Sequence, residues 1–197
     1  MFTQLSLKNF KAWRNVEKVD SSGQSHFGRI DIPLAPVTML LGTNSSGKSS
    51  LLQALLLLKQ TAVSPDRSVH LNLGGNEAND YFNFGHFDDV LTHNASPRLF
   101  ELGFKFRRPD SASASETRRL QSGEFLATYS KTSAGATVVQ ELALRSDASF
   151  YRAIRRDKGA YSIMVGDETQ PRGKSRAYAP ERSIALPVEA VQLLAAD

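Results

Sequence analysis

Residues 36–52 read PVTMLLGTNSSGKSSLL, and residues 42–49 within them fit the pattern G-x-x-x-x-G-K-[ST] of a phosphate-binding loop. The apolar run Val37–Leu41 before the loop is long enough for one buried strand. Residues 49–60 after it are rich in leucine and contain no helix breaker. They predict a helix that is apolar on nearly every face and therefore buried at the centre of a domain. Strand, loop and helix follow one another in the order that the motif requires.

Each residue type in the loop suits a phosphate ligand. Gly42 and Gly47 permit backbone dihedrals closed to other residues, so the N–H groups can curl inward at the positive end of the following helix. Lys48 supplies an ammonium for the β- and γ-phosphates, and the Ser49 hydroxyl is a ligand for Mg²⁺. We therefore expect ATP and Mg²⁺ as ligands; the alternative is a Gly/Ser-rich turn that happens to precede a helix. The predicted nucleotide-binding residues are Gly42, Thr43, Asn44, Ser45, Ser46, Gly47, Lys48, Ser49 and Ser50, with Ser49 also the metal ligand.

The composition of the chain excludes several classes of protein. Of its 197 residues, 41% are hydrophobic and 22% are charged, as in ordinary globular proteins. The chain contains no cysteine, which excludes disulfides and thiolate nucleophiles. Neither a membrane span nor a signal segment is recognisable, so we expect a cytoplasmic chain without a membrane partner. The net charge of +4 is too mild to indicate nucleic-acid binding by itself.

Short strands are predicted on both sides of the loop by alternating or β-branched apolar residues. Those of the first half lie at Phe2–Phe10, Val16–Asp20, Ile30–Leu34, Ser68–Leu73 and Leu99–Phe106. Those of the second half lie at Gly123–Lys131, Ala136–Arg145, Phe150–Arg156 and Tyr161–Val165. Because turn residues separate the later strands without helices between them, we expect an antiparallel meander there. Val188–Ala195 is predicted to form a short helical or frayed end.

The predicted fold class is α/β, a P-loop NTPase lobe with an antiparallel β subdomain. Residues 1–106 would form the lobe, with its strands, loop and buried helix. Residues 107–182 would form the β meander, and residues 183–197 a C-terminal segment.

The triplet Asn9-Phe10-Lys11, followed later by G-x-N-x-S-G-K-S and then by LLQAL, resembles a known family. It is similar to the N-terminal half of the ATPase heads of SMC, RecF and OLD proteins, which are related to ABC transporters. It also resembles bacterial stand-alone AAA-type ATPases that carry this head and are often linked to phage defence. The resemblance covers residues 2–106. It implies an ATP-binding lobe of an incomplete head, acting in DNA repair, DNA maintenance or defence, with a second ATPase lobe or a second copy as partner.

The resemblance implies further roles for particular residues. Lys11 matches a basic residue that approaches the γ-phosphate in relatives; the alternative is a solvated lysine in a turn. Trp13 would cover the adenine by stacking, or it packs on the first strand. DNA is a possible partner through a basic face; the alternative is an ordinary solvated surface. That face would comprise Arg107, Arg108, Arg118, Arg119, Arg152, Arg155, Arg156 and Lys158.

The motifs that complete such a head are not recognisable in this sequence. Relatives use a Gln loop, an L-S-G-G-Q-like signature, an apolar strand that ends in Asp-Glu, and a late His. No Gln stands between Thr61 and Leu120, where Asp88, Asp89, His93 and Asn94 occupy the zone without matching. Residues 120–124 match the signature weakly, and residues 163–168 match the Asp-Glu strand weakly. The catalytic residues are therefore unknown, and we expect hydrolysis only with a complementary lobe.

Two other classes of function compete with this reading. A small P-loop kinase would need more βαβ units and an acceptor site, and a GTPase would show N/T-K-x-D, which the sequence lacks. A non-catalytic nucleotide-binding module that serves only in protein interaction remains the main alternative.

Overall fold

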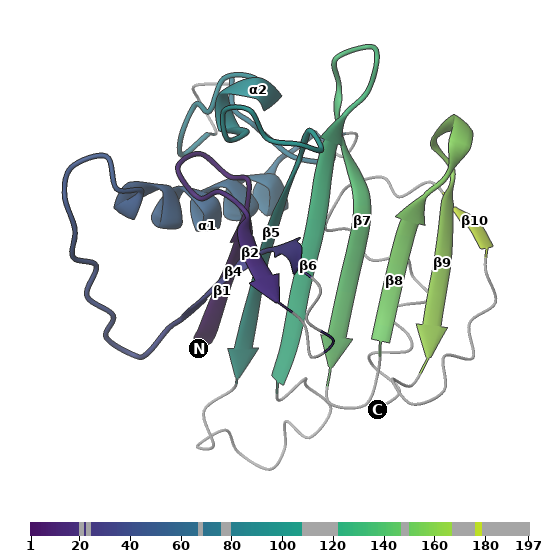
Figure 1. The fold of residues 1–197 in the computed structure, drawn as a ribbon. Helices are drawn as coiled ribbons and strands as arrows, with labels where there is room; N and C mark the ends of the chain where they lie inside the picture. The colour runs from purple at the N-terminus through teal and green to yellow at the C-terminus, as the bar shows by residue number, and fades with distance from the viewer. Residues whose placement is uncertain are drawn as a thin grey trace.

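The computed structural model describes residues 1–19, 22, 25–66, 69–75, 80–107, 122–146, 150–166 and 176–178. These residues form one large antiparallel sheet with a long helix across one of its faces (Figure 1). The order in the sheet is β10 (Arg176–Tyr178), β9 (Tyr161–Gly166), β8 (Phe150–Arg155), β7 (Thr137–Ser146), β6 (Ser122–Lys131), β5 (Leu99–Arg107), β1 (Phe2–Lys8) and β4 (Ile30–Pro33). A separate hairpin pairs β2 (Val16–Val19) with β3 (Ser25–Gly28).

The strands from β5 to β10 form an antiparallel meander, which confirms that prediction. The register of β5 and β6 places Phe100 opposite Tyr129 and Leu102 opposite Ala127. Since β1 pairs with both β5 and β4, the sheet runs without a break from the N-terminal strands into the meander. The expected boundary between residues 106 and 107 therefore falls within one continuous sheet. Residues 183–197, including the predicted helical end, lie outside the described residues.

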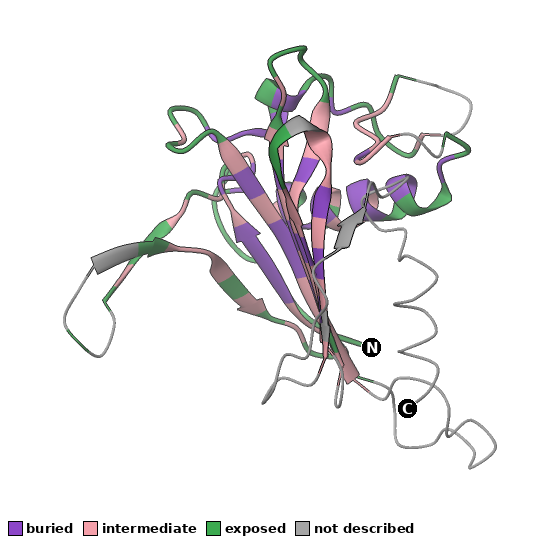
Figure 2. Cartoon of the chain, turned by 90° about the vertical axis from the view of Figure 1, so that its right-hand side faces the viewer, coloured by how far each residue is buried: buried purple, intermediate pink, exposed green. Residues whose placement is uncertain are grey.

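The two faces of the sheet differ in chemistry because side chains alternate along each strand. The apolar face buries Leu5, Phe100 and Tyr129, together with their neighbours on adjacent strands. Buried and half-buried residues accordingly alternate along the strands in Figure 2. The opposite face carries ion pairs such as Lys8–Glu101 at 3.2 Å, which keep that face polar. One face therefore holds the apolar core, and the other is polar.

Helix α1 (Lys48–Val63) lies across the apolar face of the sheet (Figure 1). Ala54 and Leu57 on its inner side are fully buried, whereas Leu52 on its outer side is 60% exposed. The prediction of a helix buried on every face is therefore wrong for the part of the chain that the structure describes. Leucine fills both sides of α1, but the sheet covers only one of them.

The segment after α1 is held by a polar side chain of the helix. Gln60 is fully buried, and its amide donates to the carbonyls of Asn72 and Phe82, at 2.7 and 3.2 Å. The Thr61 hydroxyl oxygen accepts a hydrogen bond from the backbone N–H of Asn72 at 2.9 Å. Side chains of the helix thus form hydrogen bonds with these backbone groups, and residues 69–73 form no strand. The prediction of a strand at Ser68–Leu73 is therefore wrong over these residues. The short helix α2 (Phe87–Val90) follows, before β5.

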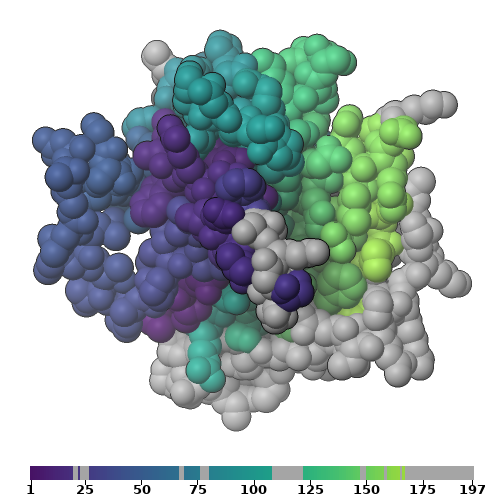
Figure 3. All heavy atoms as spheres, viewed as in Figure 1, coloured from purple at the N-terminus to yellow at the C-terminus, as the bar shows by residue number. Residues whose placement is uncertain are grey.

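The strand predicted at Val37–Leu41 is also not formed. The chain from β4 to α1 leaves the body as a wide arc (Figure 1), and Figure 3 shows an opening between this arc and the body. Val37, Met39 and Leu41 are 87%, 78% and 83% exposed. A strand needs a hydrogen-bonding neighbour, and none of the described strands pairs with these residues. Their sequence suits a buried strand, but the described part of the chain provides no neighbouring strand for them to pair with.

Candidate functional site

The phosphate-binding loop curls through three residues with positive φ. These are Gly42 at 150°, Ser45 at 62° and Gly47 at 92°. Gly47 is the N-cap of α1 in the left-handed conformation, which leads the chain into the first turn of the helix. A Cβ added at Gly42 would stand 2.9 Å from the Ser46 hydroxyl oxygen, which can rotate away, so it is the φ of 150° that favours glycine there. The two glycines that define the sequence pattern are thus required by the geometry of the loop.

The Lys48 side chain folds back over this loop. Its ammonium donates to the carbonyls of Gly42 and Thr43, at 2.8 and 2.6 Å, and lies 3.5 Å from the Ser46 hydroxyl oxygen. The cation is thereby held at the centre of the loop, at the N-terminal end of a sixteen-residue helix. A helix of this length carries a partial positive charge at that end, and its first turn contains no acidic residue. The loop is therefore electropositive.

The exposure of the loop fits an anionic ligand that approaches from solvent. Residues 42–46 and Ser49 are exposed, whereas Gly47 and Ser50 are buried. Ser49 is thus accessible to a ligand that approaches from solvent. The loop combines backbone N–H groups between two glycines, the Lys48 ammonium and exposed hydroxyl groups. Such a set of groups would suit a nucleoside triphosphate and its metal ion. The loop residues predicted from sequence are brought together in space.

A turn at the end of β1 stands against this loop. Asn9 and Lys11 have positive φ values of 53° and 50°. Asn9 is buried. Its side-chain amide donates to the Leu99 carbonyl at 3.2 Å, and its side-chain oxygen accepts from the backbone N–H of Asn15 at 3.2 Å. A short polar side chain that bonds the backbone locally supports such a conformation. Asn9 therefore shapes the turn.

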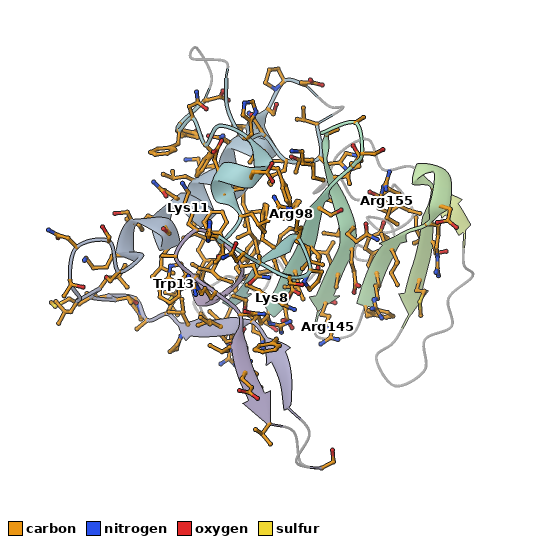
Figure 4. The ribbon with its side chains drawn as sticks, turned by 45° about the horizontal axis from the view of Figure 1, so that its top comes forward. Lys8, Lys11, Trp13, Arg98, Arg145 and Arg155 are labelled. Atoms are coloured by element: carbon orange, nitrogen blue, oxygen red, sulfur yellow. The ribbon has the colours of Figure 1, made fainter. Side chains whose placement is uncertain are left out.

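Lys11 and Trp13 belong to the same turn but contact different parts of the molecule. The Lys11 ammonium lies over the Phe84 ring, 5.5 Å from its centroid, so its predicted contact with a γ-phosphate stays a prediction. The Trp13 indole N–H donates to the Gly47 carbonyl at 3.0 Å. Figure 4 shows Lys11 near α2 and Trp13 beside the loop. Neither interpretation of Trp13 from sequence included a contact with the loop, because nothing in the sequence pairs residues so far apart.

The carboxylates in the zone of the missing Gln loop have structural partners. Hydrogen bonds from Lys131 and then Arg98 lower the pKa of Asp88 below its usual value. Asp89 accepts from the His86 amide at 2.7 Å and caps α2. His93 and Asn94 are exposed. None of the four is shown to reach the phosphate-binding loop.

The weak matches to the other motifs have equally ordinary positions. Ser122–Glu124 open strand β6, where Glu124 pairs with Arg29 at 3.3 Å. Ile163–Val165 belong to β9, and residues 120, 121, 167 and 168 lie outside the described residues. Within the described ranges, no group of three or more His, Asp or Glu side chains could hold a metal ion. Catalytic residues therefore stay unassigned.

The basic residues considered for DNA are only partly described. Arg152 pairs with Glu141 at 2.7 Å, and the Arg156 guanidinium donates to the Ser162 hydroxyl at 2.8 Å. Arg108, Arg118 and Arg119 lie outside the described residues. Pairing reduces the charge that Arg152 can offer to a phosphate backbone, and DNA binding stays a prediction.

Comparison with known proteins adds one finding. A family model described as an AAA ATPase domain matches residues 1–155, which include the loop, α1 and the strands through β8. No curated protein and no solved structure matches the chain significantly. Among the helices that the structure describes, none is long and apolar enough to cross a membrane.

Proposed function

Because this chain belongs to the AAA ATPase domain family, we propose that it is the ATP-binding lobe of an ATPase head of the SMC/RecF/OLD type. The observation that carries the proposal is the loop itself. Gly47 turns into α1 in the left-handed conformation, and Lys48 is gathered over the loop carbonyls. A role in DNA repair, DNA maintenance or phage defence follows from the resemblance of residues 2–106 to such heads.

The residues of the loop have distinct tasks in this proposal. Lys48 would exchange the two carbonyls for β- and γ-phosphate oxygens, which are stronger acceptors because they are charged. Ser49 would hold Mg²⁺, and the backbone N–H groups of residues 43–45 and 47–49 would bind the remaining oxygens. ATP supplies the phosphoanhydride bond, whereas these residues bind it, orient it and offset its charge. Lys11 would approach the γ-phosphate only by leaving the Phe84 ring.

The nucleotide site needs a second lobe in this proposal. The exposed side chains of Val37, Met39 and Leu41 form an extended apolar segment directly before the loop. Leu52 and Val63 on the outer side of α1 are also exposed. Clustered exposed apolar side chains mark interaction sites, and an unpaired segment of backbone can pair with a strand from a partner. The partner would be a second ATPase lobe or a second copy of this chain, facing the triphosphate from the side opposite Lys48.

Calorimetric titration tests nucleotide binding. Mg-ATP should bind the unmodified chain, and Lys48→Ala should weaken it roughly tenfold to a hundredfold by removing a charge-assisted contact. Lys59→Ala is the matched control, because it removes the same charge from the same helix at a position over the Tyr81 ring. Equal affinities of Lys48→Ala and the unmodified chain, with the fold intact, would refute the proposal. Titrations with GTP and without Mg²⁺ separate it from other P-loop classes.

A steady-state ATPase assay tests the need for a second lobe. A loop that binds ground state and transition state alike gives affinity without rate. We therefore expect the isolated chain to turn over far below ~1 s⁻¹, an ordinary enzymatic rate, and to gain activity when a complementary lobe is added. Rapid Lys48-dependent turnover by the chain alone would contradict this, and Glu168 would then be the first candidate base. Binding without turnover in every assembly would favour a non-catalytic interaction module.

A further inference from the structure

Trp13, the single tryptophan of the chain, lies directly against the glycine that starts α1. Its indole nitrogen is 3.0 Å from the Gly47 carbonyl oxygen. A Cβ added at Gly47 would stand 2.9 Å from that nitrogen and 3.2 Å from both Cε2 of the ring and the Ala12 Cβ. The indole edge and Ala12 therefore occupy the space in which any side chain at position 47 would stand.

The contact acts on the peptide that begins the helix. The Gly47 carbonyl accepts both the indole N–H and the Ser50 amide, the latter at 3.0 Å. The peptide group is planar and trans, so fixing the direction of this carbonyl points the Lys48 N–H the opposite way, away from the indole. Backbone N–H groups at this end of a helix are the donors that bind phosphate. Trp13 thus sets the orientation of one such donor without standing among the loop residues.

The indole is itself anchored in the body of the molecule. Phe10 is fully buried, and its backbone exchanges two hydrogen bonds with that of Trp13, at 3.0 and 2.8 Å. The Lys11 amide donates to the Val90 carbonyl, and the Thr92 hydroxyl donates to the Lys11 carbonyl, both at 2.7 Å. The turn that carries Trp13 is therefore held by the core and by the segment around α2. The loop, in contrast, is exposed over residues 42–46.

We propose that Trp13 is a positioning residue for the phosphate-binding loop, which fixes the Gly47 peptide so that the helix N-terminus is preorganised for the phosphates. The inference rests on the proposed nucleotide binding. It differs from adenine stacking in one measurable respect, because a residue that orders the loop acts on any polyphosphate whether or not a base is present. A stacking residue would act only on ligands with a base.

The experiment compares Trp13→Phe with the unmodified chain by calorimetry, using Mg-ATP and the magnesium salt of inorganic tripolyphosphate. Trp13→Phe keeps most of the ring but removes the N–H donor, so we expect both ligands to bind about threefold to tenfold more weakly, by the same factor. Tyr161→Phe is the matched control. It removes an aromatic donor from another backbone carbonyl, that of Val139 within the sheet, and should change neither affinity. Thermal melting of each variant confirms that the chains compared are folded.

Each outcome of this comparison supports or refutes the positioning role of Trp13. Equal binding of tripolyphosphate to Trp13→Phe and the unmodified chain would overturn the inference, and a loss for Mg-ATP alone would indicate adenine stacking instead. An equal loss in Tyr161→Phe would show a general effect of stability and would also overturn it. Failure of the unmodified chain to bind either ligand would refute the proposed function itself.

Discussion

The sheet body and the arc of residues 34–47 contain similar apolar sequences, but these apolar side chains are buried in the body and exposed in the arc. Leu102 in β5 is 0% exposed, with strands paired on both sides of its own. Leu41 in the arc is 83% exposed, and no described strand pairs with it. The difference shows that a run of apolar residues encodes a capacity to form a strand. Hydrogen-bonding neighbours decide whether the strand is formed.

The comparison also separates two kinds of order in one chain. The body is held by its apolar core, whereas the loop in the arc is tied down chiefly through Gly47, Lys48 and Trp13. Segments with few buried apolar contacts open most readily, and binding sites are often drawn from them. We therefore expect mutations in the body to change stability and mutations in the arc to change binding.

The largest expected effect comes from a matched pair of leucines. Leu102→Ala removes a fully buried side chain and should lower the free energy of unfolding by about 2–5 kcal/mol. Leu41→Ala removes the same atoms from an exposed position and should change it by no more than about 0.5 kcal/mol. Urea denaturation of the isolated variants measures both. Comparable losses in the two variants would mean that the arc packs against the body in solution.

A smaller effect is expected where α1 holds the segment that follows it. Gln60→Leu would leave the carbonyls of Asn72 and Phe82 without their buried donor, at a cost of about 1–3 kcal/mol in the free energy of unfolding. Gln53→Leu, a change on the same helix at a half-buried position, is the control and should cost less. Chemical denaturation compares the two. Equal costs would show that these hydrogen bonds do not anchor the segment.

The smallest effect is a pH dependence at His70, which accepts the Val139 amide at 3.1 Å. Burial, with Arg155 nearby, lowers the pKa of His70 below its ordinary value of 6.5. The unfolded chain then takes up the proton more readily than the folded chain, so stability should be full above pH 6.5 and decline as the pH falls below it. His70→Asn retains an acceptor but does not titrate. Melting curves between neutral and mildly acidic pH should therefore show a shallower decline for His70→Asn, and parallel curves would contradict the assignment.

Several features could be predicted from sequence because local patterns determine them. Alternation along residues 99–166 indicated the meander, and glycine spacing indicated the loop and the start of α1. The strand β3 at Ser25–Gly28 was not predicted, because serine and glycine, which begin and end it, are typical of loops. Leu71 and Leu73 suggested a strand, but Gln60 and Thr61 bind the backbone between them. The contact between Trp13 and Gly47 joins residues 34 positions apart, and only the folded chain brings them together.

Hydrogen exchange of the backbone amides, with and without Mg-ATP, tests whether nucleotide binds at this loop, because it reports on the loop and the body in one experiment. Mg-ATP should slow exchange at residues 43–50 and leave β5 and β6 unchanged, and Lys48→Ala should reduce this slowing at the same Mg-ATP concentration. Unchanged exchange at residues 43–50 under saturating Mg-ATP, or protection confined to the sheet, would contradict the assignment of this loop as the nucleotide site.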